Sequence, residues 1–254
     1  MLSQAPDQRS IDIAAATTRK IPVGHTPVGL TDATADLTWA LLMAARQVVA
    51  GDRFTRSGQW QTWEPALLLG PDVAGQLWTS LGFGRIGQAI AKRALGFGMR
   101  ILYHSHHRAA FELEEALNTE WVPLATSLQT SDFVTLHTLL TPETKHLINA
   151  NTLGQMKSSA ILINTAHGHI IDSAALYRAL NTGQIAGAAI NVTDPEPISM
   201  DSPLLTLDNL IITPHIGSAS QQTRETMAKI AIASLIAGLK GAPLPHCVNP
   251  EVYH

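Results

Sequence analysis

The chain has 254 residues, of which 45% are apolar and only 15% are charged, against roughly 25% charged in an average soluble domain. This balance excludes a disordered protein, and the net charge of -3 leaves no basic excess for a dedicated nucleic-acid binder. The single cysteine, Cys247, excludes an intrachain disulfide and any multi-cysteine zinc or iron–sulfur site.

Neither end of the sequence has the pattern of an exported or membrane-inserted protein. The first residues, MLSQAPDQRSID, lack the basic-then-apolar layout of a signal peptide. The apolar stretch at residues 230–239 is much shorter than the roughly 20 apolar residues that a membrane span needs. We therefore expect a soluble, cytoplasmic protein with no membrane partner.

The first third of the chain is irregular except for one apolar run. Residues 1–30 are broken by prolines and glycines, with a possible strand at residues 21–23. Thr31 or Asp32 can cap a helix that continues to Gly51 and is apolar almost all round, so we expect it to be buried. Residues 53–71 read as a loop that carries bulky side chains.

From residue 77 onward, short β-like runs alternate with helical runs. The predicted strands are 77–81, 100–103, 133–137, 160–164, 186–192 and 210–213, with a shorter one at 121–122; the predicted helices are 85–95, 112–118, 124–129, 149–156 and 173–180. A final helix starts at Ser218 or Ser220 and ends near Lys240, before Gly241. This alternation predicts an α/β fold with a doubly wound parallel sheet. Strand 77–81 is atypical because Trp78, Thr79 and Ser80 interrupt it, whereas buried parallel strands are usually aliphatic.

A glycine-rich loop follows the first of these strands and opens a helix. Its sequence is GxGxxG: Gly82-Phe83-Gly84-Arg85-Ile86-Gly87. In this context the glycines permit a tight turn, close approach of a pyrophosphate and close helix–strand packing. We interpret the loop as a dinucleotide site; a plain tight turn is the alternative.

The end of the next predicted strand favours NADP(H) over NAD(H). An NAD site usually has an acid there for the ribose 2′-hydroxyl, but this chain has Tyr103-His104-Ser105-His106-His107-Arg108. The hydroxyl of Ser105, the imidazole of His106 and the guanidinium of Arg108 suit a 2′-phosphate. A metal site at the histidines and a solvated polar turn are the alternatives.

Several segments together resemble the D-isomer-specific 2-hydroxyacid dehydrogenase family, from about Ile11 to the C-terminus. They are TDATADLTWALL, LGFGRIGQAIAKRALGFGMRILYHS, LTPETKHLIN, AILINTAHGHIID, INVTDPEP and TPHIGSAS. Ser105 and the segment Trp60-x-x-Trp63-x-Pro65 resemble the glyoxylate/hydroxypyruvate reductase branch. The resemblance implies a Rossmann-type cofactor domain at residues 37–219. It also implies a residual flavodoxin-like substrate domain, incomplete at the N-terminus, at residues 1–36 and 220–254.

The resemblance further implies the roles of individual residues. His215 donates a proton to the keto oxygen, Glu196 hydrogen-bonds His215, and Trp63 reaches the substrate pocket of a partner subunit. The alternatives are a structural histidine for His215 and core or dimer-interface packing for Trp63. Besides the glycine loop, Ser105, His106 and Arg108, the implied cofactor contacts are His137, Thr138, Thr165, Ala166, His167, Asn191, His215 and Gly217. No metal is needed, because the hydride chemistry belongs to the cofactor.

The sequence departs from the family at three places. His167 stands where the family has a catalytic arginine that grips the substrate carboxylate, and a neutral imidazole offers only one donor. Asn191 stands where the family has an aspartate, and we expect this replacement to tune cofactor binding rather than abolish it. Only about 30 residues precede the long helix, and Pro6-Asp7-Gln8-Arg9 align with a loop that presents backbone amides to the substrate.

Two functions follow from the resemblance and its departures. The first is an NAD(P)H-dependent reductase of small 2-keto acids, of the glyoxylate or hydroxypyruvate type, that acts as a homodimer. The second is a truncated, catalytically impaired relative that binds NADP(H) without turnover.

Overall fold

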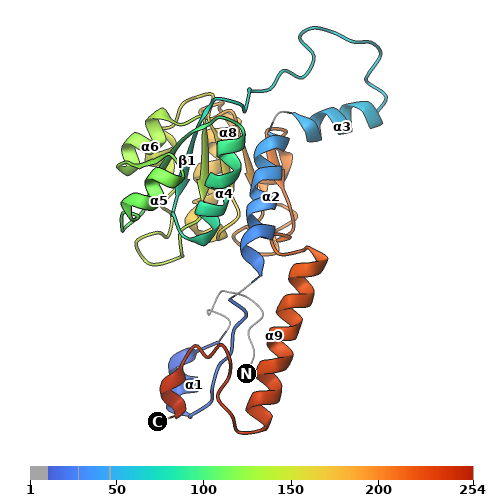
Figure 1. Ribbon diagram of the computed structural model, residues 1–254. Coiled ribbons are helices and arrows are strands. Elements are labelled where there is room, and N and C mark those ends of the chain that lie inside the picture. Colours follow the sequence, from blue (N-terminus) through green and yellow to red (C-terminus); the bar gives the residue numbers. More distant parts are fainter. Residues whose placement is uncertain (1–10, 28, 46, 254) are drawn as a thin grey trace. The chain divides into compact units, whose positions relative to one another are not determined.

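The computed structural model describes residues 11–27, 29–45 and 47–253, and the chain divides into two compact units. Unit 1 comprises Met1–Ala33 with Ser218–His254, and unit 2 is Thr34–Gly217. Figure 1 shows the ribbon of both units. The residues expected to face the substrate at the N-terminus, Pro6 to Arg9, lie outside the described residues.

Unit 2 is built on a seven-stranded sheet whose paired strands are all parallel, in the order β3-β2-β1-β4-β5-β6-β7. The strands are β1 (Leu77–Leu81), β2 (Arg100–His104), β3 (Thr119–Trp121), β4 (Phe133–Leu136), β5 (Ile161–Asn164), β6 (Gly187–Ile190) and β7 (Leu210–Ile212). The doubly wound, Rossmann-type sheet predicted from the sequence is therefore confirmed.

Helices cover both faces of this sheet, and one apolar core lies on each face. They are α2 (Leu30–Ala44), α4 (Arg85–Gly96), α5 (Phe111–Ala116), α6 (Leu124–Thr130), α7 (Ala150–Leu153) and α8 (Ser173–Asn181), with 3₁₀ turns η2 (Gly168–Ile170) and η3 (Pro203–Thr206). Residues of α2 and α4 share one core with Phe133 and Ile163, whereas α6, α7 and α8 share the other with Val134 and Leu162. Neighbouring strand residues thus enter opposite cores, as the pleat of a strand requires.

The polar residues of β1 are buried at the centre of the sheet, and each of them makes a hydrogen bond to a residue outside the strand. The Trp78 Nε1–H donates to Thr135 Oγ1 (3.1 Å), Thr79 Oγ1 and Ser131 Oγ are 2.5 Å apart, and the Ser80 hydroxyl donates to the Gly82 carbonyl (2.6 Å). Because buried polar groups are tolerated when hydrogen-bonded, this strand forms in spite of its atypical composition.

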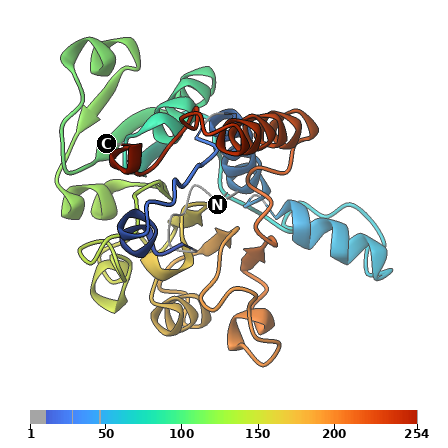
Figure 2. The ribbon, with the colours of Figure 1, turned by 90° about the horizontal axis from the view of Figure 1, so that it is seen from below.

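The prediction of one long helix that continues to Gly51 is wrong, because two helices cover this part of the chain. The first begins at Leu30, ahead of both predicted caps, and a second helix, α3 (Val48–Arg56), follows Gln47, whose φ of 64° is left-handed. All residues of α3 are partly or fully exposed, so the expected burial is also wrong for this part. Figures 1 and 2 both show α3 and the loop after it extending away from the sheet of unit 2.

Unit 1 contains α1 (Ile13–Thr18), α9 (Gln221–Leu239) and η4 (Pro250–Tyr253). Helix α1 was not predicted; Asp12 caps it by accepting from the Ala15 N–H (2.8 Å). The strand expected at residues 21–23 is wrong, because the Val23 N–H bonds to the side chain of buried Asn249 and Gly24 makes only an isolated bridge to Cys247. Across the described ranges, every helix is too short or too polar to cross a bilayer.

Candidate active site

The predicted site residues follow one transverse row of the sheet. Strand register aligns the ends of the central strands as His104, Leu81, Leu136, Asn164, Ile190 and Ile212. The residues directly after the first five are Ser105, Gly82, His137, Thr165 and Asn191. Since the strands are parallel, these residues meet at the carboxyl edge of the sheet. The strand order reverses between β1 and β4, where an open α/β sheet binds its ligand.

Each glycine of the loop after β1 meets a different constraint. Gly82 has φ 95°, and a Cβ there would lie 2.5 Å from the backbone carbonyl of His137. A Cβ on Gly87 would lie 2.6 Å from the Gly82 carbonyl oxygen, so helix α4 packs tightly on the loop. Around Gly84, by contrast, a Cβ would meet nothing within 4 Å. The first and third glycines are thus needed for packing, whereas the second leaves open space.

Helix α4 presents its N-terminus to that open space. Gly84 is the N-cap and supplies no side-chain cap; Arg85 is exposed, and Ile86 is half-buried. The N–H groups of the first turn and the helix dipole favour an anion here. Phe83 points inward and stacks on Tyr103, with ring centroids 4.1 Å apart.

Two buried polar atoms at the end of β4 have no partner among the described residues. They are His137 Nε2 and Thr138 Oγ1, beside the backbone that Gly82 approaches. Burial lowers the pKa of His137 from 6.5 to about 3, so its imidazole is neutral. Unpartnered polar groups next to a glycine cradle and a helix N-terminus fit a dinucleotide that would supply their hydrogen bonds.

The polar turn after β2 is more ordered than its composition suggests. The Ser105 hydroxyl donates to the His107 carbonyl (2.5 Å), and His106 Nδ1 lies 3.2 Å from His107 Nε2. Arg108 makes two hydrogen bonds to Glu114. Within the described part of the chain, no group of three or more histidine, cysteine or carboxylate side chains could hold a metal ion.

The structure brings together His215 and Glu196, a contact that the family resemblance implied. Glu196 Oε1 lies 2.5 Å from His215 Nδ1, and both side chains remain well exposed. His215 adopts φ 51°, and its N–H donates to the carbonyls of Asn191 and Thr213 (both 3.0 Å). The ring nitrogen Nε2 is therefore the one left to face a reactant, with Nδ1 engaged by the carboxylate.

Asn191 organises the loop that carries His215. Its buried Oδ1 accepts hydrogen bonds from the Thr213 hydroxyl (2.9 Å) and the Ile216 N–H (2.8 Å). A Cβ on Gly217 would approach Asn191 Nδ2 to 3.2 Å, so that amide lies against the same loop. An acceptor at this position is what the loop requires, and asparagine provides one.

The segment with His167 lies directly beside the segment with Glu196. Asn164 Nδ2 donates to the His167 carbonyl (2.8 Å), and its Oδ1 accepts from the Ala166 N–H (3.0 Å). A Cβ on Gly168 would overlap the Thr193 carbonyl. On the other side, Thr165 Oγ1 lies 2.7 Å from Thr38 Oγ1 of α2. Half-buried His167 is thus held by its backbone between β5 and the loop after β6.

One pair of residues in this region was not predicted. His169 Nε2 lies 3.5 Å from Asp194 Oδ1, which joins the two segments again. His169 stands two positions from His167, and Asp194 stands two positions from Glu196. This spacing was the only signal in the sequence that could have predicted the pair.

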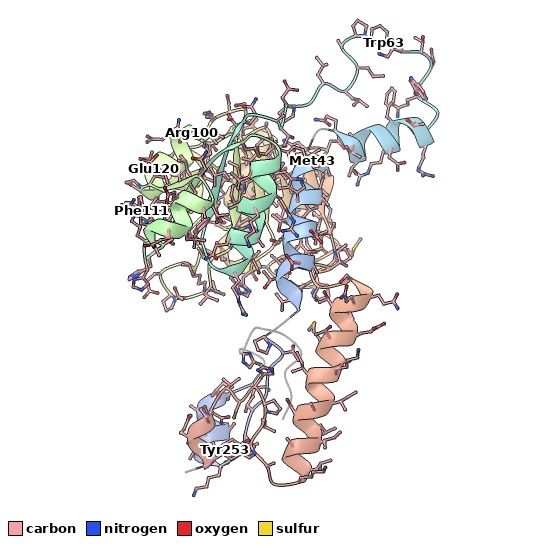
Figure 3. All side chains as sticks on the ribbon, in the orientation of Figure 1. Met43, Trp63, Arg100, Phe111, Glu120 and Tyr253 are labelled. Atoms are coloured by element: carbon pink, nitrogen blue, oxygen red, sulfur yellow. The ribbon has the colours of Figure 1, made fainter. Side chains whose placement is uncertain are left out.

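Trp63 does not join the site of its own chain. It lies on the projecting loop after α3, with 78% of its surface exposed. Figure 3 labels it far from the sheet of unit 2. Packing of Trp63 in the core of its own chain is therefore wrong, and its contact with a partner subunit stays a prediction.

Comparisons with known proteins agree with this geometry. The model of the D-isomer specific 2-hydroxyacid dehydrogenase, NAD binding domain, matches residues 38–217. A glyoxylate reductase from Pyrococcus horikoshii is 53% identical over 248 residues, which are 96% of this chain and 74% of the relative. A crystal structure from Thermus thermophilus is 48% identical with a TM-score of 0.90, covering 96% of this chain and 76% of that one. A glyoxylate reductase from Paecilomyes thermophila is 32% identical with a TM-score of 0.86, covering 98% and 74%. The chain therefore belongs to the D-isomer specific 2-hydroxyacid dehydrogenase family and contains its NAD-binding domain.

Proposed function

We propose that this chain reduces small 2-keto acids with NAD(P)H: glyoxylate to the achiral 2-hydroxy acid, and hydroxypyruvate to the 2-hydroxy acid of D configuration. The observation that carries the proposal is the His215–Glu196 pair beside the carboxyl edge of a sheet that also bears a dinucleotide loop. The names of the relatives from Pyrococcus horikoshii and Paecilomyes thermophila support the substrate class.

The proposed chemistry needs a proton donor and a carboxylate anchor from the protein. When bound, a reduced nicotinamide supplies a hydride to C2 of the keto acid. His215 delivers the accompanying proton to the keto oxygen from Nε2, while Glu196 accepts the Nδ1–H and stabilises the charged imidazolium. Proton and hydride together give the hydroxy acid, with no further co-reactant.

We assign the substrate carboxylate to His167 and the neighbouring backbone. The packing of the segment with His167 on the segment with Glu196 supports this assignment. An imidazole supplies one hydrogen bond where arginine supplies a charged, bidentate pair. We therefore expect weaker substrate binding and slower turnover than an arginine at this position would give.

We propose that NADP(H) is preferred over NAD(H). An NAD site usually has a free carboxylate after β2, whereas the buried carboxylate of Glu114 on α5 already accepts from Arg108 and Tyr103. At this strand end the side chains of Ser105 and His106 make hydrogen bonds to His107 of the same turn, and Arg108 shares its guanidinium with Glu114; all three side chains are at least partly exposed. Such groups suit a 2′-phosphate.

We infer that unit 1 contributes the substrate domain and that the enzyme works as a homodimer. Trp60, Trp63 and Leu69 are exposed apolar side chains on the segment that projects from unit 2. A mainly apolar cavity of about 350 Å³ lies between this segment and the amino ends of β5–β7. Large exposed apolar groups of this kind mark an interaction surface, and multi-angle light scattering tests whether the chain is a dimer.

The cytoplasmic location stays a prediction from the sequence.

A second candidate function is NADP(H) binding without turnover, which His167 in place of arginine favours. One assay separates the two. The purified chain is mixed with NADPH and hydroxypyruvate, and the loss of reduced-nicotinamide absorbance is followed. Hydroxypyruvate is chosen because its product is chiral, so chiral chromatography also tests the D configuration.

Enzyme-dependent loss that disappears in His215→Gln supports the reductase. If neither the wild-type chain nor His167→Arg turns over at high protein concentration, while both bind NADPH in a calorimeter, the binding module is correct. Absence of both turnover and binding contradicts both functions.

A further inference from the structure

A buried tyrosine connects the two halves of the dinucleotide site. The Tyr103 side chain, at the end of β2, is fully buried, and its ring stacks on Phe83 of the glycine loop. Its hydroxyl donates to Glu114 Oε1 (2.5 Å) and accepts from the Ala109 N–H (2.8 Å). Tyr103 thereby fastens the turn after β2 to the glycine loop after β1.

Glu114 on helix α5 holds Arg108 in one orientation. Arg108 Nε donates to Glu114 Oε1 (2.9 Å), and an Nη2 hydrogen donates to Oε2 (2.8 Å). The carboxylate is buried, with 7% of the side chain exposed, whereas 63% of the Arg108 side chain is exposed. The guanidinium therefore turns its inner edge to Glu114 and has an outer edge toward solvent.

The protonation states favour this arrangement at neutral pH. Hydrogen bonds from Arg108 and Tyr103 lower the pKa of Glu114, and the bond to Glu114 raises the pKa of Arg108. Burial and the bond to Glu114 raise the pKa of Tyr103 to about 12. The carboxylate is thus charged, the guanidinium is charged and the phenol keeps its proton.

We propose that Glu114 is a positioning residue for cofactor specificity: by fixing the inner edge of Arg108, it presents the outer edge to a 2′-phosphate. The inference rests on the proposed preference for NADP(H). Two of the five guanidinium N–H groups are used by Glu114, which leaves three for a ligand. A long exposed arginine otherwise loses side-chain entropy on binding, and the pair with Glu114 removes that loss beforehand.

The negative charge of Glu114 repels a 2′-phosphate, but we expect this repulsion to be smaller than the gain from positioning Arg108. The carboxylate lies behind the guanidinium and is neutralised by it, so the phosphate meets the pair rather than a free carboxylate. Glu115, an exposed carboxylate on the same helix, is a matched control for charge alone.

The test uses two fragments that differ only in the phosphate of interest, adenosine 2′,5′-bisphosphate and 5′-AMP. Their Kd values are measured by isothermal titration calorimetry with the full chain. We expect Glu114→Gln to reduce the preference for the bisphosphate about tenfold, with little change in the Kd of 5′-AMP. Glu115→Gln should leave the preference unchanged or raise it slightly.

Tyr103→Phe provides a second variant in case Glu114→Gln does not fold, which circular dichroism would show. It removes the phenol that supports Glu114, and we expect a smaller reduction of the same preference. An unchanged or increased preference in both folded variants overturns the role of Glu114 while the NADP(H) proposal stands. A wild-type chain without any preference for the bisphosphate overturns both.

Discussion

Glu196 and His215 are 19 residues apart in sequence, yet Oε1 of the first lies 2.5 Å from Nδ1 of the second. Two different loops bring them together, one after β6 and one after β7. The loop of His215 is fixed independently by buried Asn191, so the pair is set by the sheet rather than by its own hydrogen bond. Substitutions can therefore change the chemistry of the pair without moving its backbone.

Replacing Glu196 by glutamine should slow the reduction without unfolding the chain. A neutral amide can still hydrogen-bond the imidazole, but it stabilises the imidazolium less. We expect kcat with NADPH and hydroxypyruvate to fall about tenfold for Glu196→Gln, and about 10²- to 10⁴-fold for His215→Gln. Steady-state kinetics with a thermal melt of each variant checks this. Equal activity of Glu196→Gln and the wild type would contradict the assigned role.

Replacing His167 by arginine should increase kcat/KM. The change restores a charged fork beside the segment of Glu196, and such a pair is worth roughly 2–5 kcal/mol, or roughly 30-fold to several-thousand-fold in rate. His169→Arg, two positions away on η2, introduces the same charge and serves as the control. A gain in the control as large as in His167→Arg would indicate a general charge effect instead.

Variants of two loop glycines, Gly82 and Gly84, should separate folding from binding. Gly84→Ala adds a methyl group into open space at an allowed φ, so we expect an unchanged melting temperature and a Kd for NADPH at least about tenfold weaker. Gly82→Ala places a Cβ against the His137 backbone at φ 95° and should prevent stable folding. Calorimetry and thermal denaturation distinguish the two. Tight NADPH binding by Gly84→Ala would argue against a pyrophosphate at this loop.

The sequence was sufficient for the sheet but not for features that depend on distant partners. Strand β1 matched its predicted range, although its burial relies on Thr135 and Ser131, which no local pattern reveals. The break at Gln47 was missed because no proline, and no glycine before Gly51, interrupts the apolar run, and a left-handed φ at a glutamine has no signal in the sequence.

The candidate site shows the same division. The motif around Gly82 and the residues after each strand could be predicted, because parallel register brings strand ends together. Arg108 was predicted as a phosphate ligand, and this stays a prediction; its pairing with Glu114 was not predicted, since that contact depends on how α5 packs against β2. The sequence therefore indicates which side chains lie near the site, whereas tertiary packing determines which hydrogen bonds each of them makes.

His137 should make the stability of the chain depend on pH. Its pKa is about 3 in the folded chain and ordinarily 6.5, so the unfolded chain takes up a proton between these values that the folded chain does not. Stability is then lost as the pH falls below about 7, and the loss between pH 7 and pH 5 is about 2 kcal/mol. His137→Asn removes this contribution. Urea denaturation at both pH values should show a smaller pH-dependent loss, by about that amount, in the variant.

His146→Asn is the matched control for this experiment. His146 is exposed, and asparagine tolerates its left-handed φ of 51°, so its replacement should leave the pH dependence of the wild type intact. NADPH should also protect the wild type more than His137→Asn against urea at pH 7, because the neutral imidazole lies at the strand end that the dinucleotide loop approaches. Identical pH dependence in wild type and His137→Asn would mean that His137 becomes protonated without unfolding, and that its Nε2 is not held away from water.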